Sequence, residues 1–445
     1  MIGFIQKIRI FLFANNDPGQ TVAKNTAWLF TGQMASRALR ALIVIYAARL
    51  LGVASWGAFS YALGVATFLT VFSDIGIGAL LTREGAKSPE MRSRYLATAI
   101  GTKLFLLTGI ALLVIAFFPY LTKIEEAAAI MPILIFVFIF DTLRDLGSAF
   151  SRALEKMEVE AILQIFTNAC IVALGFLALT LQGTSYALAL AYAAGSGLGL
   201  LGMFYALRRH LKGVFRNFSL RLVKEIIVAA WPFGLFGIMG IVMLNTDVIM
   251  LGWLRTPEEV GYYAAAQKLV QLLYVIPTIV ATAIFPTLTR LAKTHTEEAK
   301  RLLERNVARS FVAAIPIAAI GVLLGPWIIK LSFGAAYEPA TYVFQILMAT
   351  VLIIFPSALV GNAVFAYGET RSFARFAFFA IVGNVAADAL LIPYYGIEGA
   401  AIATVIIQLL TNGLIWHKMK RLNGFTVLPE IKNVLSQLTQ RKTAR

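Results

Sequence analysis

The sequence predicts an all-α polytopic membrane protein, with twelve transmembrane helices in two parallel six-helix repeats around a central cavity. Three observations predict this fold class. Of the 445 residues, 59% are hydrophobic and 14% are charged, whereas an ordinary soluble chain carries about 25% charged residues. The apolar residues form runs of about 20, the length of a helix that crosses a bilayer. The two halves of the chain also share a pattern of glycines.

Twelve runs are long and apolar enough to be membrane spans. They cover 26–50, 56–82, 95–119, 128–150, 161–181, 186–207, 226–253, 260–288, 309–331, 340–366, 372–392 and 398–417. The second and eighth runs are long, and we expect them to tilt or to extend beyond the bilayer.

The basic residues predict the orientation of these spans. With the N-terminus inside, 30 of the 39 Lys and Arg residues fall on the cytoplasmic side, and only four lie in outer loops or at the outer ends of spans: Arg49, Lys123, Arg255 and Lys330. An excess of positive charge is typical of cytoplasmic loops. Both termini are therefore predicted to be cytoplasmic, and the net charge of +16 requires no nucleic-acid partner.

This topology divides the chain into five parts. They are a cytoplasmic N-terminal segment (1–25), an N-terminal six-helix lobe (26–207), a basic cytoplasmic linker (208–225), a C-terminal six-helix lobe (226–417) and a basic cytoplasmic tail (418–445). Met1–Phe13 predicts an amphipathic helix on the membrane surface rather than a signal peptide, because its charges lie inside the apolar run. Thr294 and Glu297 have the spacing of a capping box, which predicts a separate amphipathic helix on the inner membrane face.

An internal repeat relates the two halves. The matched glycines are Gly52 with Gly252, Gly57 with Gly261, and Gly183 with Gly396, at offsets of 200, 204 and 213 residues. Six spans in each repeat give both repeats the same orientation, and parallel repeats of this kind are one known transporter plan.

Three segments carry a resemblance to a known family. They are KNTAWLFTGQMASRALRALIVIYAARLLGVASWGAFSYA (24–62), NTDVIMLGWLRTPEEVGYYAAAQKL (245–269) and LIPYYGIEGAAIAT (391–404). They resemble the polysaccharide-type flippases of the multidrug/oligosaccharidyl-lipid/polysaccharide exporter superfamily, and the similarity runs nearly the whole length of the chain. The resemblance implies a flippase that moves an undecaprenyl-diphosphate-linked oligosaccharide from the inner to the outer leaflet of a bacterial cytoplasmic membrane. It also implies cations on the first span.

Arg37 and Arg40 are the sharpest candidates for substrate contact. With Gln33 they fall on one face of the first span, near its middle. Each charge costs about 2.5–3.5 kcal/mol at the centre of a lipid-exposed helix, so the pair should face water or counter-charges. Guanidinium groups suit a multidentate anion such as a diphosphate. The alternative is a structural ion pair with Asp74 or Asp141.

Other intramembrane charges predict gating or ion coupling. Asp141 and Arg144 can pair at i, i+3, and Asp145 then needs a nearby cation because it lies one turn from Asp141. Asp74 lies at a comparable depth, where structural and coupling roles are equally open.

Two more candidates flank an outer loop of the second half. Asp247 and Lys268 lie at matching depths and could pair across two helices. Lys268 is also the third cation candidate for the diphosphate. Asp388, near the outer end of its span, is expected to be interfacial.

The sequence predicts neither an enzyme nor a cofactor or metal site. His210, His295 and His417 are scattered, Cys170 is the only cysteine, and no P-loop is present. The expected partners are a lipid-linked oligosaccharide, membrane lipids and other polysaccharide-assembly proteins. Two alternatives stay open: a drug or cation antiporter of the same superfamily, which a cationic cavity opposes, and a membrane enzyme acting on lipid-linked sugars, which the short outer loops oppose.

Overall fold

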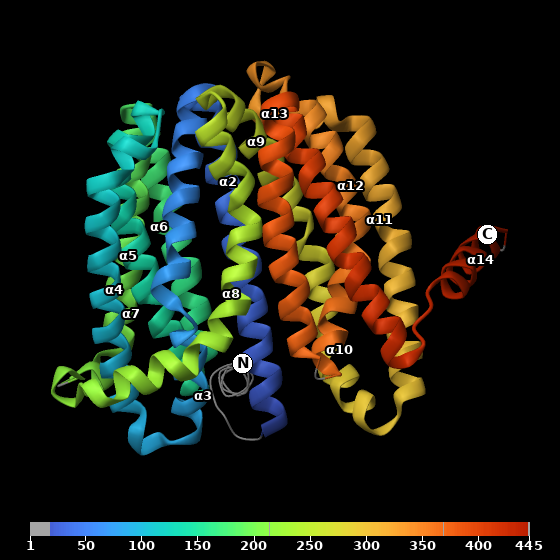
Figure 1. The fold of residues 1–445 in the computed structure, drawn as a ribbon, viewed down its shortest axis with the longest axis horizontal. Coiled ribbons are helices and arrows are strands. Elements are labelled where there is room, and N and C mark those ends of the chain that lie inside the picture. Colours follow the sequence, from blue (N-terminus) through green and yellow to red (C-terminus); the bar gives the residue numbers. More distant parts are fainter. Residues whose placement is uncertain (1–17, 213, 368, 444–445) are drawn as a thin grey trace, which may run out of the picture. The chain divides into compact units, whose positions relative to one another are not determined.

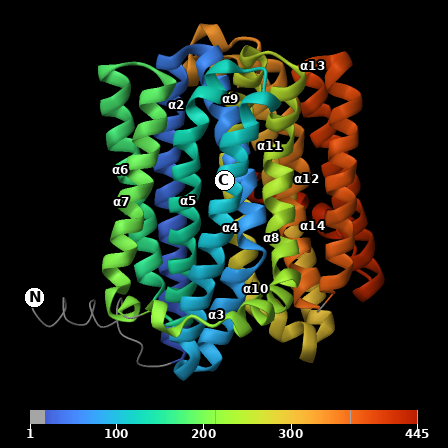
Figure 2. The ribbon, with the colours of Figure 1, turned by 60° about the vertical axis from the view of Figure 1, so that its left-hand side comes forward.

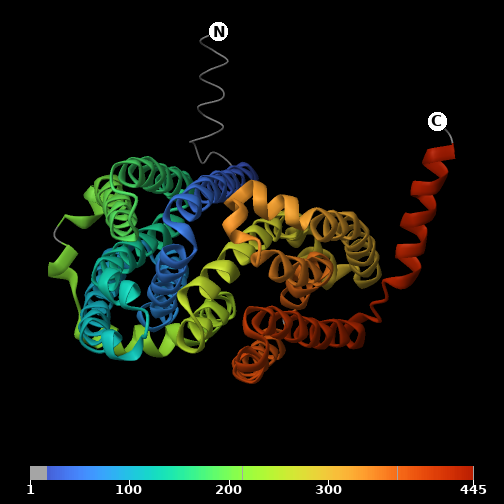
Figure 3. The ribbon, with the colours of Figure 1, turned by 90° about the horizontal axis from the view of Figure 1, so that it is seen from above.

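The computed structural model describes residues 18–212, 214–367 and 369–443, and these residues form helices joined by short turns. The predicted surface helix at Met1–Phe13 lies outside the described residues. Contacts between Cα atoms divide the chain into two compact units. Unit 1 is Met1–Leu51 with Ala58–Ile241, and unit 2 is Gly52–Gly57 with Val242–Arg445. The long helices of each unit run side by side (Figures 1 and 2) and are seen end-on in Figure 3.

The first half of the chain contributes the following elements: α2 (Pro18–Asp74), α3 (Ile77–Lys87), η1 (Pro89–Met91), α4 (Arg92–Leu121), α5 (Glu125–Ala153), α6 (Met157–Leu181), α7 (Ser185–Leu211) and η2 (Val214–Asn217). The second half contributes α8 (Leu220–Leu254), α9 (Pro257–Leu273), α10 (Val275–Thr294), α11 (Thr296–Phe333), η3 (Ala335–Tyr337), α12 (Ala340–Ala366), α13 (Thr370–Asn423) and α14 (Leu428–Thr443).

These helices account for the twelve predicted spans. Nine helices of the described residues are long and apolar enough to cross a membrane, and a shorter apolar helix covers Ile241–Leu254. Two of the nine, Ala23–Asp74 and Phe378–Asn423, each contain two predicted spans, because Gly52 and Gly396 have non-helical torsion angles inside α2 and α13. The chain is therefore a multi-pass membrane protein with the predicted fold class.

Spans 2 and 8 were predicted as single helices, and the structure breaks both of them. Span 2 is interrupted at Ile75 and Gly76, with φ of 38° and 84°, between α2 and α3. A β-branched residue at positive φ is strained. The interruption of span 8 is milder: α9 ends at Leu273 and α10 begins at Val275, but Tyr274 between them keeps helical torsion angles (φ −64°, ψ −12°). The two breaks fall in corresponding spans of the two halves.

The capping box expected at Thr294 is not formed, because the Thr294 hydroxyl donates to the carbonyl of Arg290 instead. The predicted amphipathic helix is the first part of α11, which continues without a break into the ninth span. A capping box does occur at the start of α9, where Thr256 and Glu259 cap each other's backbone N–H groups.

Two of the three matched glycine pairs have a structural counterpart. Gly183 and Gly396 both precede the last span of their half, with φ of +59° and +60°. A side chain on Gly57 would meet the backbone of Pro257 and Gly261, and a side chain on Gly261 would meet the carbonyl of Val53. Gly252, matched to Gly52, is instead helical within α8.

Each unit has a buried apolar cluster at what we call its basic end. The basic end is the end at which the chain passes from α3 to α4, α5 to α6, α7 to α8, α10 to α11 and α13 to α14. In unit 1, η2 and the start of α8 pack over α3, α4, α5 and α7 around Phe150 and Met203. In unit 2, α10 to α14 pack around Leu303, Leu359 and Met419.

We predict that Gly261→Val lowers the thermal stability of the protein, because the added side chain would enter the space occupied by the Val53 backbone. Overpacking of this kind costs about 1–3 kcal/mol. The measurement is the thermal midpoint of the detergent-purified protein. Gly109→Val is the matched control, since Gly109 also lies in a span but has open space around it. Equal midpoints for the two variants would contradict the close packing of these segments.

Candidate functional site

The polar groups of unit 1 begin with the predicted arginine pair on α2. The Arg40 Nε donates to the Asn168 Oδ1 of α6 at 2.7 Å. Asn168 is buried, and its own Nδ2 donates to the carbonyl of Gln164, so its oxygen is held toward Arg40. A neutral amide thus positions Arg40 without cancelling its charge.

Arg37 is half-buried and close enough to Arg40 for the two cations to repel each other. Within the described residues, neither arginine forms an ion pair with Asp74 or Asp141, which was the structural alternative; both aspartates pair elsewhere. Gln33, on the same face, is exposed. The pair therefore keeps its positive charge available for an anion.

The predicted pairing on α5 is confirmed. The Arg144 Nη1 lies 2.7 Å from the Asp141 Oδ1, and its Nη2 lies 3.5 Å from the Asp145 Oδ1. One guanidinium group thus bridges both aspartates and relieves the repulsion expected between them. This arrangement joins neighbouring turns of a single helix.

Asp74 pairs with a residue that the sequence did not single out. The Lys103 Nζ of α4 lies 2.6 Å from the Asp74 Oδ1, and the Lys103 side chain is only 2% exposed. Asp74 is the last residue of α2, directly before the strained Ile75. The ion pair therefore fastens the broken span 2 to α4 at the point of the break.

Unit 2 contains a second polar cluster, centred on Asp247 of α8. Its Oδ2 accepts hydrogen bonds from the Thr404 hydroxyl at 2.7 Å and from the Tyr263 hydroxyl. Its Oδ1 accepts one from the Asn384 Nδ2 at 2.8 Å. The sequence left open a pair with Lys268; the donors named here are neutral groups of α9 and α13. Lys268 is half-buried, six residues before the break at Tyr274.

Asp388 belongs to the same cluster, and its predicted interfacial position is wrong. It is 0% exposed, and its Oδ2 accepts from the same Asn384 Nδ2 at 2.8 Å. Its Oδ1 is buried without a hydrogen-bond partner. Position along a span indicates depth but not burial. The i, i+4 spacing of Asn384 and Asp388 places both on one helix face and could have identified the cluster.

The Asp247 cluster, comprising Asp247, Asp388, Asn384, Tyr263 and Thr404, can bind a small cation or a proton. Two buried carboxylates that share an amide donor repel each other unless a positive charge joins them. Carboxylate, hydroxyl and amide oxygens are also the ligands that hard cations prefer. The unpartnered Asp388 oxygen provides an acceptor within this site.

Comparison with known proteins agrees with this fold. The family model described as polysaccharide biosynthesis protein matches residues 22–292, and the MatE model matches residues 232–390. A Shigella flexneri protein named as an O-antigen transporter is 24% identical over 86% of this chain and 94% of its own. A Haloferax volcanii protein named as the flippase AglR is 23% identical over 94% of this chain and 87% of its own.

Solved structures share the fold at low sequence identity. The lipid II flippase MurJ, in an inward closed conformation, superposes with a TM-score of 0.77 at 16% identity, over 94% of this chain and 92% of its own. An inward-facing multidrug resistance MATE family transporter gives a TM-score of 0.67 at 17% identity, over 86% of this chain and 94% of its own.

We predict that cations or low pH stabilise the protein through the Asp247 cluster. Added Na⁺, or acid in a choline buffer, should raise the thermal midpoint by about 1 °C for each 1 kcal/mol of binding free energy in a chain of this length. Asp388→Asn should abolish that rise, because one of the two repelling charges is removed. Asp74→Asn, an aspartate outside the cluster, is the control and should keep it. A full Na⁺- and acid-dependent rise in Asp388→Asn would contradict the assignment.

Proposed function

Since the chain belongs to the polysaccharide biosynthesis protein family, we propose that it is a flippase. Its substrate in this proposal is a polyprenyl-diphosphate-linked oligosaccharide for cell-surface polysaccharide biosynthesis. The protein would move it across a bacterial cytoplasmic membrane by alternating access. Relatives named as an O-antigen transporter and as glycan biosynthesis flippases support this proposal, and they are transporters rather than enzymes.

The observation that carries the proposal is the arginine pair of α2. Arg37 and Arg40 lie within a membrane span, and within the described residues neither is neutralised by an acid. Their positive charge requires an anion or water. A diphosphate offers several oxygens to two guanidinium groups, so we assign them to the diphosphate, with Gln33 beside them and Lys268 as a further cation.

The orientation follows from the distribution of positive charge. The Lys and Arg residues gather at the basic ends of the units, and we propose that these ends lie in the cytoplasm together with both termini. The substrate would then be loaded from the side on which lipid-linked sugars are assembled.

Ion coupling is proposed for the Asp247 cluster. Binding of one cation or proton would relieve the repulsion between Asp247 and Asp388, so occupancy would change the packing of α8 against α13. Asp74, Asp141, Arg144 and Asp145 are assigned to gating, because the Asp74 ion pair joins α2 to α4 and the Arg144 ion pairs lie within the neighbouring α5.

A second candidate function is a drug or cation antiporter. The match of residues 232–390 to the MatE model favours it. The arginine pair opposes it, because a positive site repels the cationic compounds that such antiporters commonly export. Export of a cationic dye that survives Arg37→Ala with Arg40→Ala would favour the antiporter.

We predict that Arg37→Ala combined with Arg40→Ala blocks export and causes lipid-linked sugar to accumulate on the inner leaflet. Loss of two charge-assisted contacts, each worth about 1.5–3 kcal/mol, should reduce transport by at least about tenfold. The measurement is the amount of lipid-linked sugar in cells that contain equal amounts of each variant. The control is Arg301→Ala with Arg305→Ala, an exposed pair on α11. Unchanged export in the α2 variant would exclude the diphosphate role.

A further inference from the structure

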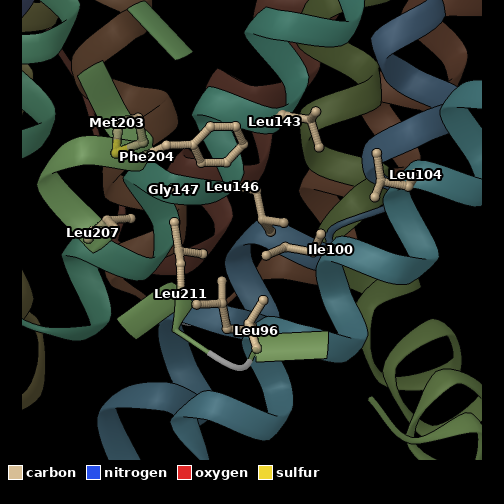
Figure 4. A pocket seen from close by; sticks show the side chains of 11 residues that line it. Leu96, Ile100, Leu104, Leu143, Leu146, Gly147, Met203, Phe204, Leu207 and Leu211 are labelled. Carbon is tan, nitrogen blue, oxygen red and sulfur yellow. The ribbon is translucent and has the colours of Figure 1, made fainter. Parts of the chain in front are cut away.

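Unit 1 contains an apolar cavity of about 330 Å³ between α4, α5 and α7 (Figure 4). Every residue that lines it is apolar. Gly147 of α5 and Met203 of α7 pack closely in its wall, since a Cβ on Gly147 would run into Met203. The volume falls within the range of about 300–1,000 Å³ typical of ligand pockets.

The cavity has a floor and an open side. Val214 of η2 lines it at the basic end, which we call its floor. Hydrogen bonds hold η2 against α4: Asn217 Nδ2 donates to the Ser93 hydroxyl at 2.6 Å, and the Ser219 N–H donates to the Thr98 hydroxyl at 3.3 Å. Two lining residues are substantially exposed, Leu104 at 37% and Phe204 at 43%. An acyl chain of a surrounding lipid can therefore enter the cavity past these two residues.

Three cations stand at the basic end of this cavity. Arg94 precedes the lining residue Leu96 by two positions, Lys212 follows the lining residue Leu211, and Arg216 follows Val214 by two positions. All three are exposed. Residues 92–96 and 211–217 contain no acid that could neutralise them. Basic groups beside an apolar pocket are the pattern that recognises an anionic lipid headgroup.

We propose that unit 1 binds one anionic phospholipid from the leaflet at its basic end. One acyl chain fills the cavity, and the phosphate is bound by Arg94, Lys212 and Arg216. The three positive charges favour an anionic phospholipid over an uncharged lipid. The site contains neither Arg37 nor Arg40, so it is separate from the proposed diphosphate site. Because η2 forms the floor, the bound lipid stabilises the segment that connects α7 to α8.

The test is native mass spectrometry of the detergent-purified full chain. Phosphatidylglycerol or phosphatidylcholine with identical acyl chains is added in increasing amounts. The wild type should retain one phosphatidylglycerol, bound at least about tenfold more tightly than phosphatidylcholine. Equal binding of the two lipids would overturn the proposal, as would displacement of phosphatidylglycerol by an equimolar short-chain prenyl phosphate.

Two variants test the contact with the lipid's acyl chain and the contact with its headgroup separately. Ile100→Trp fills the cavity and should weaken phosphatidylglycerol binding at least about tenfold, whereas Leu112→Trp, exposed on the same helix outside the cavity, should not. Arg94→Gln with Lys212→Gln and Arg216→Gln should remove the preference for phosphatidylglycerol. Arg301→Gln with Arg305→Gln and Lys432→Gln, exposed cations of unit 2, should keep it. Wild-type binding in either site variant overturns the proposal.

If Ile100→Trp fails to fold, a second measurement tests whether an acyl chain occupies the cavity. A photoreactive phosphatidylglycerol with its diazirine in the acyl chain is cross-linked to the wild-type protein in liposomes. Labelled peptides from α4, α5 and α7 around the cavity support the site. Labelling spread evenly over the lipid-exposed helices contradicts it.

Discussion

The free-energy cost of a charge in lipid is the constraint on which this structure depends. A lone charge at the centre of a span costs about 2.5–3.5 kcal/mol, and several charged residues of unit 1 have oppositely charged partners at short range. Arg144 bridges Asp141 and Asp145 within α5, and Lys103 meets Asp74 across α4 and α2. The Arg144 pairs fix side chains along α5, and the Lys103–Asp74 pair resists sliding of α4 against α2, because that motion would separate the two charges.

Two places depart from that rule, and they are the places to which we assign function. The arginine pair of α2 has positive charge in excess, held in position by the amide of Asn168. The Asp247 cluster has negative charge in excess, with neutral donors and an unpartnered oxygen on Asp388. One site suits an anionic substrate and the other suits a small cation or proton. A transporter that couples the two needs both sites, and each half of the chain supplies one.

Much of this could be predicted from local sequence patterns, and the rest could not for physical reasons. Apolar runs predicted the twelve spans, and the i, i+3 spacing predicted the Asp141–Arg144 pair. Both features depend only on residues that are near each other in the sequence. The Lys103–Asp74 pair and the contact between Asp247 and α13 join residues far apart in the chain, which helical periodicity does not encode. Asp388 was misplaced because position along a span gives depth, whereas burial depends on which face meets a neighbouring helix.

The central claim is that Arg37 and Arg40 bind a diphosphate inside a membrane span. Its most direct test is the affinity of the purified full chain for a short-chain prenyl diphosphate. We expect Arg37→Gln with Arg40→Gln to weaken that affinity at least about tenfold, while Asp388→Asn, at the other site, leaves binding in place. Equal affinity in the wild type and the double arginine variant would contradict the account.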